Sequence, residues 1–184
     1  MELRSVEELM DLLHACRGAW NTRGGDPVDL HDHALQTAAL LRRSHPADKE
    51  LQVAGLVHAI GRLLRPGDDA GHADHAAQAI RPLLGERVSR LVRLHAAAQR
   101  HPGAASPGRV TSARSEPVLP RQGRPTTHEE ATTSERDPLA DDAVTLRQAD
   151  EAAWVAGLDA GVMEDWRTLL ELVAARHARL GAVD

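Results

Sequence analysis

The chain of 184 residues contains no phenylalanine and no tyrosine, and it has only three tryptophans. Hydrophobic residues still make up 42% of the chain, and they are mainly alanine, leucine and valine. A chain of this length can bury a substantial core. The scarcity of aromatic rings argues against binding nucleic acid by stacking on its bases. We therefore expect a helical protein with an aliphatic core.

Cysteine is almost absent as well. The single residue, Cys16, excludes an internal disulfide and suits a reducing compartment. The formal net charge of −5 provides no basic surface for nucleic acid, and no segment has the length and apolarity of a membrane span or a leader peptide. We predict a soluble, cytoplasmic protein without nucleic-acid or membrane partners; its oligomeric state is not readable from the sequence.

Apolar residues recur at helical spacing along most of the chain, which predicts an all-α bundle. We interpret residues 1–184 as one domain, with an N-terminal helix inside 1–22. The predicted helices run from Val6 to about Arg17, Leu30 to Ser44, Asp48 to Leu64, His72 to Leu84, Glu86 to Arg100, Asp137 to Trp154 and Met163 to Leu180.

The stretch from 102 to 127 differs from the rest, because it is rich in proline, glycine, serine and arginine and has little periodicity. Loops of this length are uncommon inside compact domains and are often functional. The chain that follows is too short for a second domain. We therefore predict that 102–127 is a flexible lid over one end of the bundle.

Four histidines and one aspartate fall on apolar faces of the predicted helices: His33, His58, His72, His95 and Asp150. A single core histidine is usually satisfied by a backbone carbonyl, but five such groups exceed what a core needs. Imidazole and carboxylate together suit iron, zinc or manganese, and two histidines with one carboxylate form the facial triad of non-haem iron oxygenases. We predict a metal site, and place the other histidines at the surface or in loops: His14, His31, His45, His75, His101, His128 and His177.

The run GGDPVDLHDHALQTA, from Gly24 to Ala38, resembles the opening motif of the HD-domain mixed-valent di-iron oxygenases. That family includes myo-inositol oxygenase and enzymes that oxidise aminomethyl- and hydroxymethyl-type phosphonates, and the resemblance is closer to the phosphonate branch. It covers about Arg23 to Trp166. Further matching segments follow in the family's order: Leu56–Gly61, His72 with Ala76–Ala77, Val92–Arg100, Leu119–Gly123 and Asp137–Glu151.

The resemblance implies an assignment of metal ligands. One iron would be held by the residues matching His33, His58 and Asp150, and the other by those matching His72 and His95. In the family, an aspartate that follows the second histidine bridges the two irons. Here that position is Ala59, whose methyl group cannot bind a metal. The second site would therefore keep only two protein ligands.

Substrate contacts implied by the family are also altered in this chain. Arg23 stands for a tyrosine that caps one iron, and Asp26 for a glutamate that receives the substrate amine or hydroxyl. Gln99 replaces a lysine that binds the phosphonate. Ser115 and Gln122 are retained, whereas a family threonine appears as Val118 and a second lysine as Trp154. We predict catalytic roles for Arg23 and Asp26, and substrate binding by Asp26, Gln99, Ser115 and Gln122.

Three functions are compatible with these residues. The first is an iron oxygenase that uses O2 to cleave a bond at a hydroxyl- or amino-substituted carbon of a small organophosphonate-like or other polar substrate. The second is a catalytically degenerate relative that acts as a binding or regulatory module, as the loss of the bridging aspartate suggests. The third is an HD-type phosphohydrolase, which ranks last because it depends more directly on the missing aspartate.

Overall fold

The computed structural model describes residues 1–20, 28–99 and 137–181. This part of the chain is helical and contains no strand, with one isolated bridge between Trp20 and Asp29; the all-α prediction is confirmed. None of its helices is long and apolar enough to cross a membrane. The elements are α1 (Val6–Ala15), α2 (Leu30–Ser44), α3 (Lys49–Val57), α4 (Gly61–Leu64), α5 (His72–Gln99), α7 (Ala140–Ala152), the 3₁₀ helix η2 (Met163–Trp166) and α8 (Arg167–Gly181).

Helix α3 lies at the centre of the bundle and packs against α2, α5, α7 and α8. Every residue from Leu51 to Val57 is buried, because this stretch has no charged side chain that needs solvent. Asp48 caps the helix by accepting from the Leu51 N–H at 3.0 Å. The surrounding core is mostly aliphatic, as the composition predicted, with Trp166 as its largest fully buried side chain.

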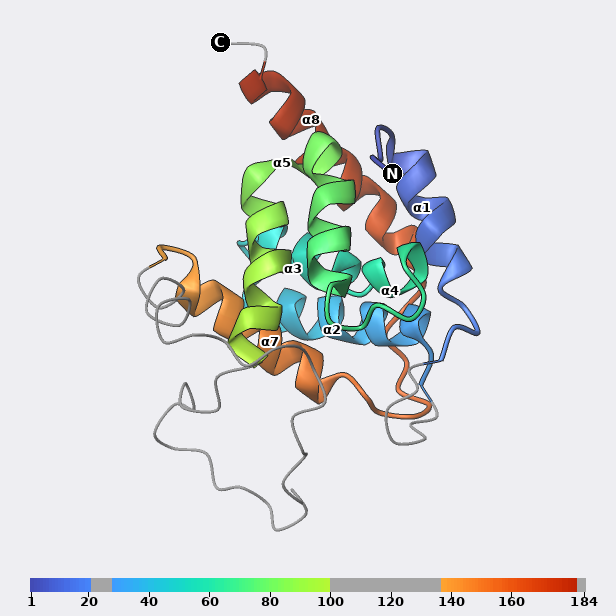
Figure 1. The fold of residues 1–184 in the computed structure, drawn as a ribbon. Coiled ribbons are helices and arrows are strands. Elements are labelled where there is room, and N and C mark those ends of the chain that lie inside the picture. Colours follow the sequence, from blue (N-terminus) through green and yellow to red (C-terminus); the bar gives the residue numbers. More distant parts are fainter. Residues whose placement is uncertain (21–27, 100–136, 182–184) are drawn as a thin grey trace.

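Helix α5 consists of two arms that lie side by side in Figure 1. The arms meet at Gly85, whose φ of 86° interrupts the helix and favours glycine. The Ser89 hydroxyl in the second arm donates to the Ala77 carbonyl in the first at 3.0 Å. The predicted division into two helices at this point is therefore confirmed. The break at Gly85 allows His72 and His95, at the far ends of the two arms, to approach each other.

The predicted helix from Asp48 to Leu64 is wrong in its second half, because α3 ends at Val57 and α4 starts at Gly61. The His58 ring donates from Nδ1 to the Gly55 carbonyl at 2.7 Å. Gly61 then passes so close to the start of α5 that a Cβ there would lie 1.8 Å from the His72 carbonyl oxygen. The chain therefore turns after His58.

Two other boundaries also differ from the sequence prediction. Helix α7 begins at Ala140, because Asp137 caps the preceding turn by accepting from the Leu139 N–H at 2.9 Å. The final predicted helix starts as the separate 3₁₀ turn η2. The predicted lid at 102–127 lies outside the described residues.

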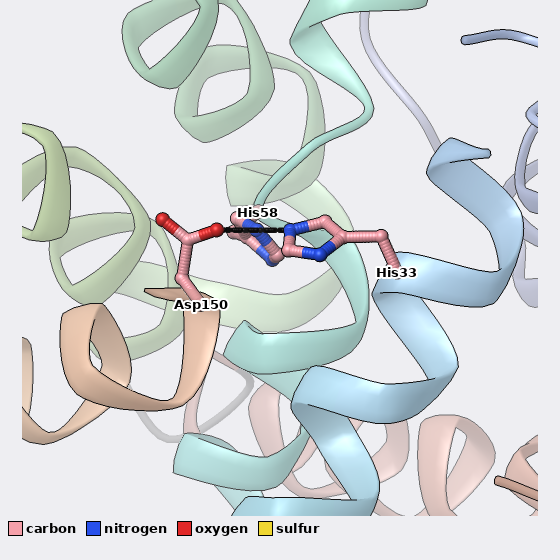
Figure 2. A group of neighbouring side chains, drawn as sticks. All are labelled: His33, His58 and Asp150. Carbon is pink, nitrogen blue, oxygen red and sulfur yellow. Dashed lines mark hydrogen bonds and ion pairs between the residues drawn. The ribbon is translucent and has the colours of Figure 1, made fainter. Parts of the chain in front are cut away.

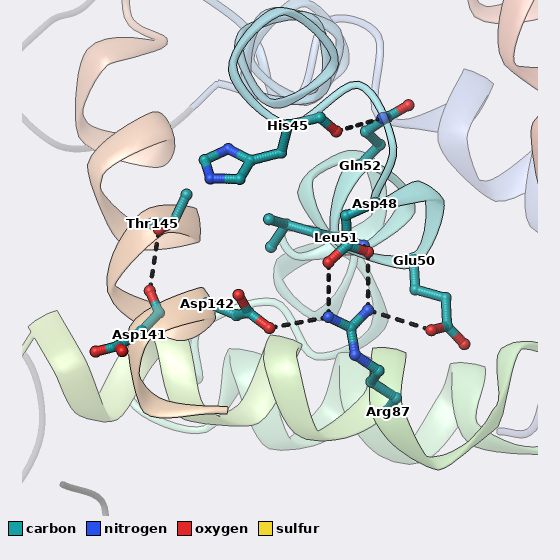
Figure 3. Close-up of polar contacts among 9 residues, drawn as sticks. All are labelled: His45, Asp48, Glu50, Leu51, Gln52, Arg87, Asp141, Asp142 and Thr145. Carbon is teal, nitrogen blue, oxygen red and sulfur yellow. Dashed lines mark hydrogen bonds and ion pairs between the residues drawn. The ribbon is translucent and has the colours of Figure 1, made fainter. Parts of the chain in front are cut away.

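A half-buried arginine, Arg87, joins helices α3, α5 and α7 (Figure 3). From α5, Arg87 binds both carboxylate oxygens of Asp48 at 2.8 and 2.7 Å, Glu50 of α3 at 3.2 Å, and Asp142 of α7 at 2.9 Å. The hydrogen bonds and charge of Arg87 lower the pKa of Asp48. This network holds the N-terminal ends of α3 and α7 against the second arm of α5.

Candidate metal centre

Three side chains from three helices converge at one point in the core (Figure 2). His33 comes from α2, His58 from the C-terminal cap of α3, and Asp150 from α7. Asp150 Oδ1 lies 2.9 Å from His33 Nε2 and 3.3 Å from His58 Nε2, and the two Nε2 atoms are 3.0 Å apart. All three side chains are buried. The predicted facial triad is thus brought together in space.

The backbone sets the protonation of both imidazoles. His33 Nδ1 lies 3.1 Å from the Ala153 carbonyl, and His58 Nδ1 lies 2.7 Å from the Gly55 carbonyl. A carbonyl only accepts, so each Nδ1 carries the proton and donates it. In the neutral rings each Nε2 then presents a lone pair to the Asp150 oxygen. Three atoms that can each donate an electron pair therefore face one another, and a cation held between them, either a metal ion or a proton, would offset their mutual repulsion.

The spacing of these atoms fits a metal ion. Three donors about 2.1 Å from one ion and at right angles to one another lie about 3.0 Å apart. The three observed separations, 2.9, 3.0 and 3.3 Å, match that value. Ring N–H groups bonded to backbone carbonyls are also the usual support for histidine ligands. The residues present therefore fit a divalent metal with two nitrogen ligands and one oxygen ligand.

The electrostatics of the site favour the charge states that metal binding needs. Burial lowers the pKa of His33, against the opposing effect of its contact with Asp150. Burial alone would raise the pKa of Asp150, but its contacts with His33 and His58 outweigh this and hold the pKa well below its usual value. Neutral imidazole and ionised carboxylate are the forms that bind a metal.

His72 and His95 continue the row of imidazoles beyond His58. The rings of His58 and His95 are 5.2 Å apart, and those of His95 and His72 are 5.9 Å apart. His72 Nδ1 faces the Asp69 carbonyl at 2.7 Å and His95 Nδ1 faces the Val92 carbonyl. His95 Nε2 is buried without a hydrogen-bond partner, although such atoms are normally satisfied. A ligand for this nitrogen is the simplest explanation.

Burial also lowers the pKa of the two further imidazoles. Burial, followed by the charge of His58, lowers the pKa of His95 to about 3. Burial, followed by the charge of Arg62, lowers the pKa of His72 to about 4. Both rings are therefore neutral at neutral pH, and the Nε2 of each is available as a ligand.

Ala59 follows His58 in the turn before α4 and is buried. Its methyl group offers no donor atom. Within the described ranges, no group of three donor atoms lying within 4.8 Å of one another includes His72 or His95. The second pair therefore offers two imidazoles to a metal, whereas the first group offers three donor atoms.

The chain just after α7 forms a wall beside His33. The ring of Trp154 stacks on that of His33, with centroids 3.8 Å apart and planes 15° from parallel. The side-chain amide of Gln36, buried in α2, pairs with the backbone of Val155: Nε2 donates to the carbonyl at 2.9 Å, and Oε1 accepts from the N–H at 3.1 Å. Sequence reasoning missed Gln36; its position one turn after His33 was the only signal.

Arg62 is a second residue that sequence reasoning did not identify. Its side chain in α4 is only 13% exposed and lies 3.7 Å from Asp69. Its charge contributes to the lowered pKa of His72, and it is in turn influenced by the charge of Asp150. A largely buried positive charge therefore lies beside the row of imidazoles, where it can attract an anion.

The structure does not describe the side chains that the sequence predicted to act on or bind the substrate. Arg23, Asp26, Ser115 and Gln122 lie outside the described residues. Gln99 ends α5, but its side chain is likewise not described. The predicted catalytic and substrate-binding roles of these residues therefore stay predictions.

The prediction that His31 lies at the surface is wrong, since only 3% of the residue is exposed. It lies in the first turn of α2, and its ring stacks with that of His14 from α1, with centroids 6.1 Å apart. His31 Nδ1 contacts Asp32 at 3.1 Å. Asp29 lies near both residues. Its two carboxylate oxygens accept from the N–H groups of Gly18 and Asp32, and the second of these contacts caps the start of α2.

Comparison with known proteins gives two relevant relatives, and no family model matches the chain. A hydroxymethylphosphonate dioxygenase of Gimesia maris is 30% identical over 151 residues, which cover 76% of this chain and 75% of the relative. A dioxygenase of Leisingera caerulea, which acts on 1-hydroxy-2-(trimethylamino)ethyl phosphonate and forms glycine betaine, is 25% identical over 176 residues. That similarity covers 87% of this chain and 89% of the relative.

Proposed function

Because the chain belongs to the HD-domain mixed-valent di-iron oxygenase family, as a divergent member of its phosphonate-oxidising branch, we propose that it is an iron-dependent oxygenase acting on a small organophosphonate. The reaction is the oxidative cleavage of a bond at the carbon that carries a hydroxyl or amino group. The observation that carries this proposal is the convergence of His33, His58 and Asp150, whose donor atoms lie 2.9 to 3.3 Å apart.

In this proposal His33, His58 and Asp150 hold one metal ion, and His72 and His95 flank a second, weaker position. Iron bound at the first position supplies the ability to activate O2. The protein keeps both rings of the triad in one orientation through the Ala153 and Gly55 carbonyls. Because the site is buried, these groups act in surroundings with little water, where charges interact strongly.

The substrate class follows from charge and from the relatives. Glycine betaine contains no phosphorus, so the Leisingera enzyme must break the carbon–phosphorus bond of its substrate. A phosphonate is an anion, and Arg62 is a largely buried cation next to the second pair of histidines. We assign Arg62 to attract the phosphonate, a role that Gln99 cannot fill because an amide carries no charge.

The test begins with metal analysis. Protein loaded anaerobically with Fe²⁺ is expected to bind at least one iron per chain, and a His58→Gln variant to bind much less. Adding hydroxymethylphosphonate and O2 should then consume O2 and release inorganic phosphate. Iron binding without O2 consumption on any hydroxy- or aminophosphonate would support instead a binding or regulatory module, the candidate favoured by Ala59.

The role of Arg62 has a separate test. Arg62→Met is expected to raise KM for the phosphonate more than it lowers kcat, because the charge binds the substrate in the ground state and the transition state alike. Arg65→Met serves as the control, since Arg65 is an exposed arginine three residues away. Equal KM values for the two variants would contradict this assignment.

A further inference from the structure

The amide of Gln36 makes a two-point contact with a backbone segment that is distant in sequence. Both of its polar atoms are used: one donates to the Val155 carbonyl at 2.9 Å and the other accepts from the Val155 N–H at 3.1 Å. Gln36 itself is 2% exposed. Paired hydrogen bonds of this kind fix orientation as well as distance, because both must be satisfied together.

The segment held by Gln36 is the one that surrounds His33. Ala153 provides the carbonyl that accepts from His33 Nδ1 at 3.1 Å, and Trp154 covers the face of the same ring at 3.8 Å. Both residues lie beyond the end of α7 at Ala152, where the Ala153 N–H still donates to the Asp150 carbonyl at 3.3 Å. The contact between Gln36 and Val155 is a side-chain anchor for the backbone directly after Trp154.

We propose that Gln36 is a positioning residue of the metal centre: its amide holds the backbone at Val155 so that the Ala153 carbonyl and the Trp154 ring keep His33 in one orientation with Nε2 directed at the metal. The inference rests on the proposed role of His33 as a ligand. It differs from a purely structural role because its effect should appear at His33 and not only in overall stability.

The chain offers a matched control in Gln52. This glutamine is also fully buried, lies on α3, and donates through Nε2 to backbone carbonyls, that of His45 at 2.8 Å and that of Pro46 at 3.2 Å. It is at the N-terminal end of α3, whereas His58 follows the C-terminal end. Replacing it removes comparable hydrogen bonds in the same bundle without touching the surroundings of His33.

The experiment compares Gln36→Met with Gln52→Met in the full chain, with two readouts. The first is the ¹⁵N chemical shift of the His33 ring in metal-free protein, assigned with a His33→Asn variant. The wild type and Gln52→Met should show a proton held on Nδ1, and Gln36→Met should show mixed tautomers. The second readout is Co²⁺ affinity, expected to fall about tenfold or more in Gln36→Met only.

The outcomes separate this inference from the proposed function. If the wild type binds no Co²⁺ or Fe²⁺, the proposed function fails, while the His33 tautomer still tests the role of Gln36. If Gln36→Met and Gln52→Met give the same tautomer and the same affinity, the inference is overturned. Should Gln36→Met not fold, the same comparison is made between Gln36→Glu and Gln52→Glu. A carboxylate at position 36 still accepts from the Val155 N–H but has no N–H to donate to the Val155 carbonyl.

Discussion

The indole ring of Trp154 lies flat on the imidazole of His33, with ring centroids 3.8 Å apart. Four residues before Trp154, Asp150 directs an oxygen to Nε2 of the same imidazole at 2.9 Å. The end of α7 therefore supplies a ligand oxygen, a backbone acceptor and a covering ring to the same site.

Trp154 should report metal binding through its fluorescence. A paramagnetic ion such as Co²⁺, bound by the imidazole on which the indole stacks, is expected to quench its emission. Trp154→Phe keeps an aromatic ring on His33 but removes the fluorophore, so quenching should be largely lost while Co²⁺ affinity stays close to that of the wild type. Trp20→Phe is the control, since Trp20 is 60% exposed. Undiminished quenching in Trp154→Phe would place the ion elsewhere.

Metal binding should also stabilise the fold. An ion present at 100 times its Kd contributes about 2.7 kcal/mol to the free energy of unfolding, or roughly 5–11 °C in Tm for a chain of this size. Thermal unfolding with and without Co²⁺ measures this shift. His58→Gln should abolish it, and His45→Gln should not, because His45 is an exposed histidine away from the triad. Equal shifts in both variants would exclude the triad as the binding site.

Restoring a carboxylate at position 59 should complete the second half-site. In Ala59→Asp the new oxygen would join His72 and His95, whose rings are already adjacent. The number of irons bound per chain is expected to rise toward two, as determined by elemental analysis after anaerobic loading. Ala59→Asn, of the same size but uncharged, is the control. No increase over the wild type would mean that the second pair no longer forms a site.

The Arg87 network should contribute strongly to stability at neutral pH. Arg87→Met leaves Asp48, Glu50 and Asp142 facing one another and is expected to lower the free energy of unfolding by about 2 kcal/mol. Arg81→Met should change it by less than about 0.5 kcal/mol, because its ion pair with Glu86 is exposed. Urea denaturation of the variants measures both effects.

The cost of Arg87→Met should depend on pH in a defined direction. Arg87 lowers the pKa of Asp48 in the folded state below its ordinary value of 3.8. A carboxyl group whose pKa is lower in the folded state than in the unfolded state stabilises the fold at pH values above its unfolded-state pKa. This contribution is lost as the pH falls through its folded-state pKa. The difference between wild type and variant should therefore be constant near pH 7 and shrink below pH of about 4. A difference that grows in acid would contradict the network.

Cys16 should be unreactive in the native protein. Burial, followed by the nearby charge of Asp29, raises the pKa of its thiol to about 12, and the residue is 1% exposed. Since the thiolate is the reactive form, a thiol reagent at pH 8 should label the native chain very slowly and the chain unfolded in guanidinium fully. Rapid labelling of the native chain would show that α1 opens readily.

The helices and the list of ligands were predictable from the sequence, because both depend on local patterns. Apolar residues at helical spacing indicate the buried face of each helix, and histidines such as His33 and His95 on those faces must have partners. The all-α fold and the five candidate ligands followed from this. The alanine at position 59 was equally visible, since a missing carboxylate is a property of the sequence alone.

Tertiary structure alone decided how these residues meet. The turn after His58 depends on the close approach of Gly61 to His72, and the burial of His31 depends on α1 packing over α2. The contact between Gln36 and Val155 joins residues 119 positions apart. Such contacts leave no periodic signal, because a single polar side chain on a helix face does not indicate which distant backbone it will bind. The sequence therefore identified the candidate donors, and packing determined the geometry that brings His33, His58 and Asp150 together.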